Sequence, residues 1–231
     1  MRCGAPKKWY RWESSDSGCV QMTFVCSVAV VDDNEALNRN LTALLRHAGH
    51  TVHSFASGED LFADGSLLDS CDCLLLDVQL PGMSGLDVLR RLSEDGEGPA
   101  VLVLTGAGDV PMAVEAMRLG AFDFVEKPYM PDALLDGIQK AGRRTADLRA
   151  SRTAARQAEA RLRKLTPRQR QVLAGIVDGR SSKIIAHELN LSVRTVEAYR
   201  AQILAKLGAR TTTDAVRVAL AAPDTLQDLA A

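Results

Sequence analysis

Short runs of apolar and β-branched residues alternate with longer amphipathic segments in the first two thirds of the chain. The runs predict five strands, at 27–31, 51–54, 73–76, 100–104 and 122–125. Helices are predicted at 35–47, 58–61, 85–92, 110–119 and 131–142. Strands that alternate with helices in this way indicate a parallel sheet with right-handed crossovers, and therefore an α/β domain.

The strand pattern ends near residue 145. Residues 145–164 contain no Gly or Pro and are rich in Ala, Arg and Glu, which favours a helical linker, placed at 146–163. Four short helices are then predicted at 167–177, 182–189, 193–207 and 214–221. Each follows a suitable N-cap, respectively Thr166, Ser181, Ser192 and Thr213. The pattern therefore predicts an all-α domain over residues 164–231.

Charge is divided unevenly between these two regions. Over 231 residues, 46% hydrophobic and 25% charged residues are typical of globular proteins, and the net charge is only -1. Residues 1–145 nevertheless hold 13 Lys and Arg against 21 Asp and Glu, whereas residues 146–231 hold 15 against 8. An acidic region joined to a basic one indicates two domains, the second suited to a polyanionic partner.

The cysteines and the first residues indicate a cytoplasmic location. Five cysteines are an odd number without zinc-type spacing, so we interpret them as reduced thiols. No apolar run approaches the roughly 18 residues of a membrane span, and the first residues lack a secretory signal. The N-terminal 21 residues match neither domain, and a tail placed at residues 1–24 is expected to be disordered, with Met22 as a hypothetical alternative start of translation.

Polar residues stand at the ends of the predicted strands. They are Asp32, Asp33, Asp77, Thr105 and Lys127. Functional groups gather beyond the carboxyl ends of strands in an open parallel sheet. Three carboxylates at one place repel each other unless a cation neutralises them, and Mg²⁺ with oxygen ligands is the expected ion.

The same residues suit phosphoryl chemistry on Asp77. Lys127 adds a positive charge and Thr105 a hydroxyl group, followed by the small residue Gly106. Together with a metal ion these groups can stabilise a phosphoryl group on an aspartate. Any one of them alone is more often a helix cap, a strand-end residue or a solvated lysine. Their occurrence at successive strand ends favours the site.

Three segments of this region resemble the receiver domain of two-component response regulators of the NarL/FixJ group. They are "VVDDNE", "LLLDVQLPGMSGLDVL" and "VLVLTGAGDVPMAVEAMRLGAFDFVEKP", and the resemblance covers about residues 26–145, with the receiver domain placed at 25–145. It implies a flavodoxin-like (βα)5 fold. It also implies that the domain catalyses only its own phosphorylation and dephosphorylation, so that the protein is otherwise not an enzyme.

The resemblance also implies a role for each site residue. Asp77 is then the phosphoacceptor. Mg²⁺ is held by Asp32, Asp33, Asp77 and the backbone carbonyl of Gln79, while Lys127 pairs with the phosphate, and Thr105 and Phe124 form the switch pair. Gln79 departs from the Arg or Met often found at that position, which is expected to tune the dephosphorylation rate.

The segment "SSKIIAHELNLSVRTVEAYRAQILAKLG" has the spacing of a helix-turn-helix. On its second helix, Val196, Ile203 and Leu207 share one face and are expected to pack inward. Arg194, Ala198 and Ala201 lie opposite and are expected to face the major groove. The full set of candidate DNA-binding residues is Lys183, Val193, Arg194, Thr195, Glu197, Ala198, Arg200 and Lys206.

An ordinary helical bundle with a solvated basic face is the alternative for this region. However, residues 164–220 resemble the LuxR-type DNA-binding domain, including "TPRQRQVL" and "RTVEAYR". The combined resemblance implies a transcription factor that a sensor histidine kinase phosphorylates. It is then expected to bind promoter DNA as a homodimer and to activate transcription, with RNA polymerase as a further partner and no membrane contact.

Two rival functions remain open at this point. A phosphohydrolase of the haloacid dehalogenase kind also uses an aspartyl nucleophile. Its nucleophile lies in an Asp-x-Asp motif, whose second aspartate is the general acid, and here position 79 is Gln. A DNA-binding protein with a vestigial receiver would not need phosphorylation. The complete set of polar residues at the strand ends argues against this second rival.

Overall fold

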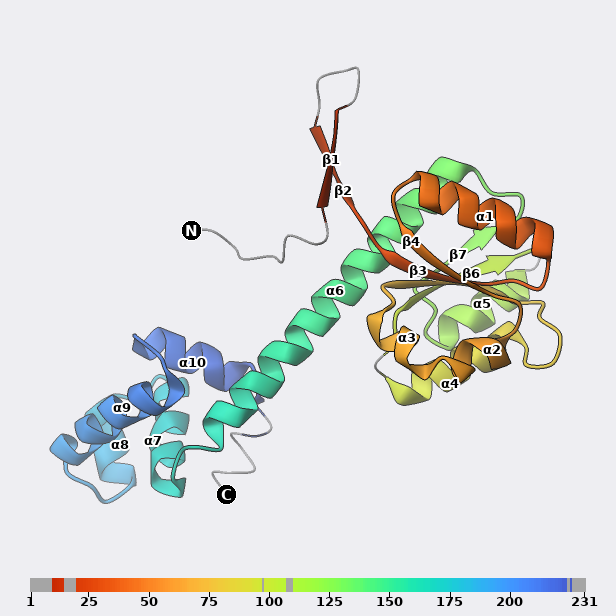
Figure 1. Cartoon of the computed structure of the whole chain (residues 1–231). Coiled ribbons are helices and arrows are strands. Elements are labelled where there is room, and N and C mark those ends of the chain that lie inside the picture. Colours follow the sequence, from red (N-terminus) through yellow and green to blue (C-terminus); the bar gives the residue numbers. More distant parts are fainter. Residues whose placement is uncertain (1–9, 15–19, 97, 107–109, 224, 226–231) are drawn as a thin grey trace. The chain divides into compact units, whose positions relative to one another are not determined.

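The computed structural model describes residues 10–14, 20–96, 98–106, 110–223 and 225 (Figure 1). The chain divides into two compact units, Met1–Asp147 and Leu148–Ala231. Among the described residues, none of the helices has an apolar stretch of the length that crosses a membrane.

Five parallel strands form the central sheet of the first unit, in the order β4-β3-β5-β6-β7. This order is the flavodoxin-like one, which confirms the predicted fold class. The strands are β3 (Ser27–Val31), β4 (Thr51–Phe55), β5 (Cys73–Asp77), β6 (Ala100–Thr105) and β7 (Asp123–Glu126). Most of their ends lie one residue beyond the predicted ones, so Asp77 and Thr105 are themselves the last residues of their strands.

Helices cover both faces of this sheet (Figure 1). On one face, α1 (Glu35–His47) and the first part of α6 (Pro131–Leu162) pack against Val30 and Leu75. The other face packs Leu74 and Leu76 against α2 (Gly58–Ala63), α3 (Gly65–Ser70), α4 (Gly85–Asp95) and α5 (Val110–Arg118). Because both faces are covered, the central strands β3, β5 and β6 are almost continuously apolar, whereas the edge strands β4 and β7 carry polar residues. Helix α3 was not predicted.

Helix α6 is much longer than expected. The sequence predicted a helix at 131–142 and a separate helical linker at 146–163, whereas the structure has one helix of 32 residues. Thr145 ties it to the sheet, since its buried Oγ1 accepts the N–H of Ala100 at 2.9 Å and donates to the carbonyl of Ala141. Helical propensity therefore continues without a break from the receiver's last helix into the linker.

The N-terminal tail contains two strands. β1 (Tyr10–Ser14) and β2 (Val20–Phe24) pair antiparallel, with Tyr10 opposite Phe24 and Ser14 opposite Val20. The structure thus places residues 10–14 and 20–24 in strands, whereas the sequence led us to expect a disordered tail; residues 1–9 and 15–19 lie outside the described part of the chain. Alternating large residues, at positions 10 and 12 and again at 20, 22 and 24, were the period-two signal that the prediction overlooked.

Three thiols lie near the start of the sheet. Cys26, Cys71 and Cys73 are buried and are free thiols in the structure; Cys3 and Cys19 lie outside the described residues. Burial raises the pKa of Cys26 to about 12 and that of Cys73 well above its usual value. Cys26 and Cys73 are therefore protonated and unreactive in the folded protein.

The second unit is all-α, as predicted. The end of α6 packs with α7 (Pro167–Val177), α8 (Ser182–Glu188), α9 (Val193–Leu207) and α10 (Thr212–Leu220). The N-caps Thr166, Ser181 and Ser192 are confirmed by side-chain hydrogen bonds. The predicted cap Thr213 is wrong: Thr211 caps α10, because Asp214 three residues later completes a reciprocal pair of hydrogen bonds with it.

Candidate functional site

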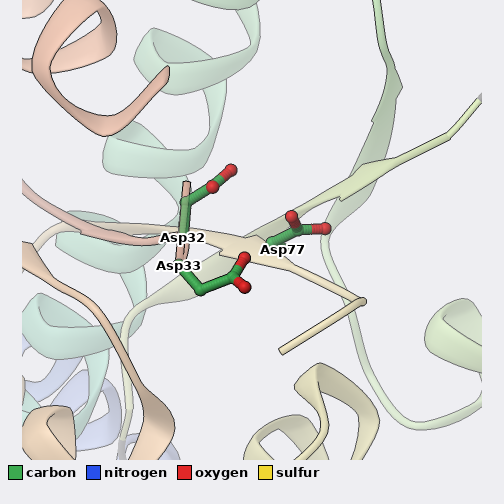
Figure 2. A group of neighbouring side chains, drawn as sticks. All are labelled: Asp32, Asp33 and Asp77. Atoms are coloured by element: carbon green, nitrogen blue, oxygen red, sulfur yellow. The ribbon is translucent and has the colours of Figure 1, made fainter. Parts of the chain in front are cut away.

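The carboxyl ends of two neighbouring strands bring three carboxylates together (Figure 2). Asp32 and Asp33 directly follow β3, and Asp77 ends β5, which pairs with β3. One carboxylate oxygen from each of the three lies within 4.8 Å of the others. Asp32 and Asp77 are buried, whereas Asp33 is exposed. The predicted cluster is therefore present as a geometric feature.

Lys127 provides the positive charge of this cluster. Its Nζ lies 2.9 Å from Asp32 Oδ2 and 2.8 Å from Asp77 Oδ2. Its backbone N–H donates to the carbonyl of Thr105 at 2.7 Å, which places it at the end of the sheet. Burial acts to lower the pKa of Lys127, but its hydrogen bonds and charge interactions with Asp77 and Asp32 outweigh burial and raise the pKa above its usual value. Lys127 is therefore positively charged at neutral pH.

Thr105 and Phe124 line a common cavity of about 410 Å³. Thr105 is buried at the end of β6, and the position next to it, Gly106, has open space where a side chain would begin. Phe124 lies on β7 and is 45% exposed. The remaining lining is mostly apolar and comes from α5, including Val110, Ala113, Val114 and Met117. The structure thus places the two predicted switch residues on one cavity.

The loop after β5 is held from two sides. The N–H of Gln79 donates to Asp77 Oδ1 at 3.2 Å, and the N–H of Met83 donates to Glu59 Oε1 at 3.0 Å. A Cβ atom at Gly85 would lie 2.1 Å from the carbonyl oxygen of Asp77, so only glycine fits there. Sequence reasoning missed Glu59, because its partner is a backbone group of a loop that only the tertiary fold brings near.

The charge balance of this cluster favours a hard divalent cation. Three carboxylates face one ammonium group, which leaves an excess of negative charge in a partly buried place. The atoms that these three side chains offer to a metal ion are carboxylate oxygens, the ligands preferred by ions such as Mg²⁺ and Ca²⁺. The same arrangement can neutralise new negative charge placed on Asp77.

Helices α8 and α9 form the predicted helix-turn-helix. Asn190 in the connection has a φ of 51°, which gives the tight left-handed turn. On α9, Val196, Ile203 and Leu207 are buried, as predicted. Arg194, Ala198 and Ala201 are exposed. The predicted division of α9 into a core face and a solvent face is therefore confirmed.

The other candidate DNA contacts differ in what they touch. Lys183 and Arg194 are exposed, and their side chains make no hydrogen bond or ion pair with any other described residue. Glu197 accepts a hydrogen bond from Ser182, and Arg200 donates to Ser182 and Thr212. Val193 and Thr195 lie on the first turn of α9, whereas Lys206, on its last turn, donates to acceptors within the unit.

Comparison with known proteins assigns each of the two units to a family. The family described as response regulator receiver domain matches residues 28–139, and the family described as bacterial regulatory proteins, luxR family, matches residues 163–219. The transcriptional regulatory protein FixJ of Bradyrhizobium diazoefficiens is 39% identical over 87% of this chain and 98% of its own length. The C4-dicarboxylate transport regulator DctR of Rhodobacter capsulatus is 40% identical over 83% of this chain and 98% of its own.

Solved structures agree with these relatives. The response regulator StyR, at 34% identity, matches 84% of this chain and 98% of its own with a TM-score of 0.72. Full-length FixJ from B. japonicum, at 38% identity, matches 86% of this chain and 98% of its own with a TM-score of 0.53. The chain therefore belongs to the two-component response regulators that join a receiver domain to a LuxR-type DNA-binding domain.

Proposed function

We propose that Asp77 accepts a phosphoryl group from a sensor histidine kinase and that this phosphorylation controls DNA binding. The observation that carries the proposal is the Lys127 ammonium group, which contacts both Asp77 and Asp32 at the strand ends. Its raised pKa keeps it charged, so it can pair with a phosphoryl oxygen on Asp77. A phosphohydrolase would require an acid at position 79, where this chain has Gln.

We further propose Mg²⁺ as the ion of the acidic cluster, held by Asp32, Asp33, Asp77 and the backbone carbonyl of Gln79. When bound, the ion neutralises charge on the phosphoryl oxygens. Asp32 is already oriented, since its Oδ1 accepts the N–H of Asn34 at 2.8 Å and its Oδ2 accepts from Lys127. Asp33 is exposed and leaves the site open to solvent and to a phosphodonor.

Thr105 and Phe124 are proposed to report the phosphorylation. The Thr105 hydroxyl group would move to donate to a phosphoryl oxygen. That movement would free space in the cavity that Thr105 shares with the half-exposed Phe124 ring, which could then turn inward. The equilibrium between the two ring positions would then depend on the phosphoryl group.

The output is proposed to be dimerisation and binding of promoter DNA with two half-sites, followed by activation of transcription through RNA polymerase. The exposed first half of α9, with Val193, Arg194, Thr195, Glu197 and Ala198, would enter the major groove, and Lys183 of α8 would contact phosphate. Arg200 lies beside them and is partly engaged with Ser182 and Thr212.

The test is phosphorylation by acetyl phosphate and Mg²⁺, followed by intact mass and by DNA binding. The wild-type chain should gain one phosphoryl group and bind DNA more tightly, and Asp77→Asn should do neither. Asp60→Asn removes an exposed carboxylate of α2 and is the control that should behave as wild type. Undiminished labelling of Asp77→Asn would refute the assignment, and equal DNA binding with and without phosphate would refute the switch.

A further inference from the structure

A buried polar network joins the C-terminal end of α6 and the start of α7 to the recognition helix α9. Its centre is Gln169, which is only 3% exposed. Gln169 Oε1 accepts from the backbone N–H of Thr166 at 3.0 Å and from Lys206 Nζ at 2.8 Å. Its Nε2 donates to Gln202 Oε1 at 2.8 Å. A buried amide satisfied in this way fixes the geometry of the helices that supply its partners.

Lys206 extends the network to the end of α6. Its ammonium group also lies 3.2 Å from the backbone carbonyl oxygen of Lys164, two residues after α6 ends at Leu162. Carbonyl groups at the C-terminal end of a helix carry partial negative charge, which favours a cation there. Two hydrogen bonds of Lys206 are therefore directed to acceptors within the protein, although the residue itself is exposed.

The network and the expected DNA-contacting residues occupy different halves of α9. Residues four apart share one side of a helix, so Ala198, Gln202 and Lys206 form one stripe. Ala198 is exposed and makes room for a partner, whereas Gln202 and Lys206 are bound to Gln169. The C-terminal half of the stripe is thus anchored to α7 and α6, and the N-terminal half remains available to DNA.

We infer that Gln169 and Lys206 are positioning residues that set the orientation of α9 for DNA binding, and that Lys206 is not a phosphate contact. This departs from the expectation that Lys206 contacts DNA. The inference depends on the LuxR-type DNA-binding domain and not on phosphorylation of Asp77. It can be tested because the two roles of a lysine differ in their salt dependence: each phosphate contact adds about one to the slope of log affinity against log salt.

The experiment measures the affinity of the full-length chain for one duplex over about 50 to 200 mM salt. The duplex is one that the wild-type protein selects from random-sequence DNA. Lys206→Met should weaken binding by about tenfold, as expected for loss of a charge-assisted hydrogen bond, with an unchanged salt slope. Lys206→Arg keeps the donor of this hydrogen bond and Gln169→Glu keeps its acceptor, so each variant should retain most of the wild-type affinity. Lys183→Met is the matched control and should lower the slope by about one.

Two outcomes would overturn the inference. A slope that falls by about one in Lys206→Met would identify Lys206 as a phosphate contact. Unchanged affinity at all salt concentrations would show that the network does not position α9. If circular dichroism shows that Lys206→Met is unfolded, Lys206→Gln takes its place, because it also removes the charge but keeps a polar group at this exposed position; the same two outcomes then decide.

Discussion

The imidazole ring of His50 lies just before β4 and is buried, with 7% of the residue exposed. Its Nδ1 accepts a hydrogen bond from the backbone N–H of Cys26 at 3.1 Å, which requires an unprotonated Nδ1. Burial lowers the pKa of His50 below its ordinary value of 6.5. The folded protein therefore binds this proton less tightly than the unfolded chain does.

The expected consequence is a loss of stability in mild acid. The stabilising contribution of neutral His50 is fully present above pH 6.5 and is lost as the pH falls through the lowered pKa of the folded state. His50→Asn keeps an acceptor but cannot be protonated, so its unfolding free energy should fall less between about pH 7 and 5 than that of wild type. Urea unfolding at a series of pH values measures the difference, and parallel curves for the two proteins would contradict the prediction.

Individual residues of the acidic cluster were predictable from sequence, because an apolar run fixes where a strand ends. Parallel strands in one sheet then place Asp32, Asp33, Asp77 and Lys127 at one edge. Glu59 was not predictable, since its partner is the backbone of a loop from another part of the chain. The contacts of Lys206 were missed for a related reason: a helical wheel predicts exposure, but it does not show which helix packs beside a residue.

At the level of elements, α6 shows where pattern reasoning fails. The helix predicted at 131–142 ends at Gly142, and glycine is common at helix ends. In the structure it lies inside α6, where a Cβ atom would come within 2.4 Å of Cys26 Sγ and 3.1 Å of Phe24 Cε1. The glycine is therefore required by packing against the residues that precede β3, a reason that only the tertiary structure reveals.

Gly142→Ala is expected to destabilise the protein by about 1–3 kcal/mol, because overpacking outweighs the better helix propensity of alanine. Gly137→Ala is the control in the same helix: its Cβ would lie 3.5 Å from Leu102, an ordinary contact, and should be neutral or stabilising by up to about 1 kcal/mol. Chemical unfolding measures both. Equal effects of the two substitutions would show that the close approach to Cys26 is not the cause.

At the scale of the whole molecule, the division between the two compact units falls within α6, after Asp147. The sequence placed the start of the DNA-binding domain at residue 164, whereas the core of the second unit includes Ala158 and Leu162 from α6. Leu162 is fully buried. We therefore propose that the independently folding DNA-binding unit begins within α6, near Leu148.

A fragment of residues 148–231 should consequently be more stable than one of residues 163–231. Truncating one buried leucine to alanine costs about 2–5 kcal/mol, and the shorter fragment loses Leu162 entirely together with Ala158. Thermal unfolding followed by circular dichroism compares the fragments, and Leu162→Ala in the longer fragment should reproduce much of the loss. Identical melting temperatures would place the boundary after α6 instead.

The three buried thiols at the start of the sheet have a use as kinetic reporters. Cys71 packs into the cluster under α2 to α5, whereas Cys26 and Cys73 pack into the cluster under α1 and α6. An alkylating reagent can reach them only when the corresponding layer opens, so the alkylation rate relative to that of an unfolded peptide gives the opening free energy of each layer. With Cys3 and Cys19 replaced by Ser, the two faces of one sheet could be timed separately in the same sample.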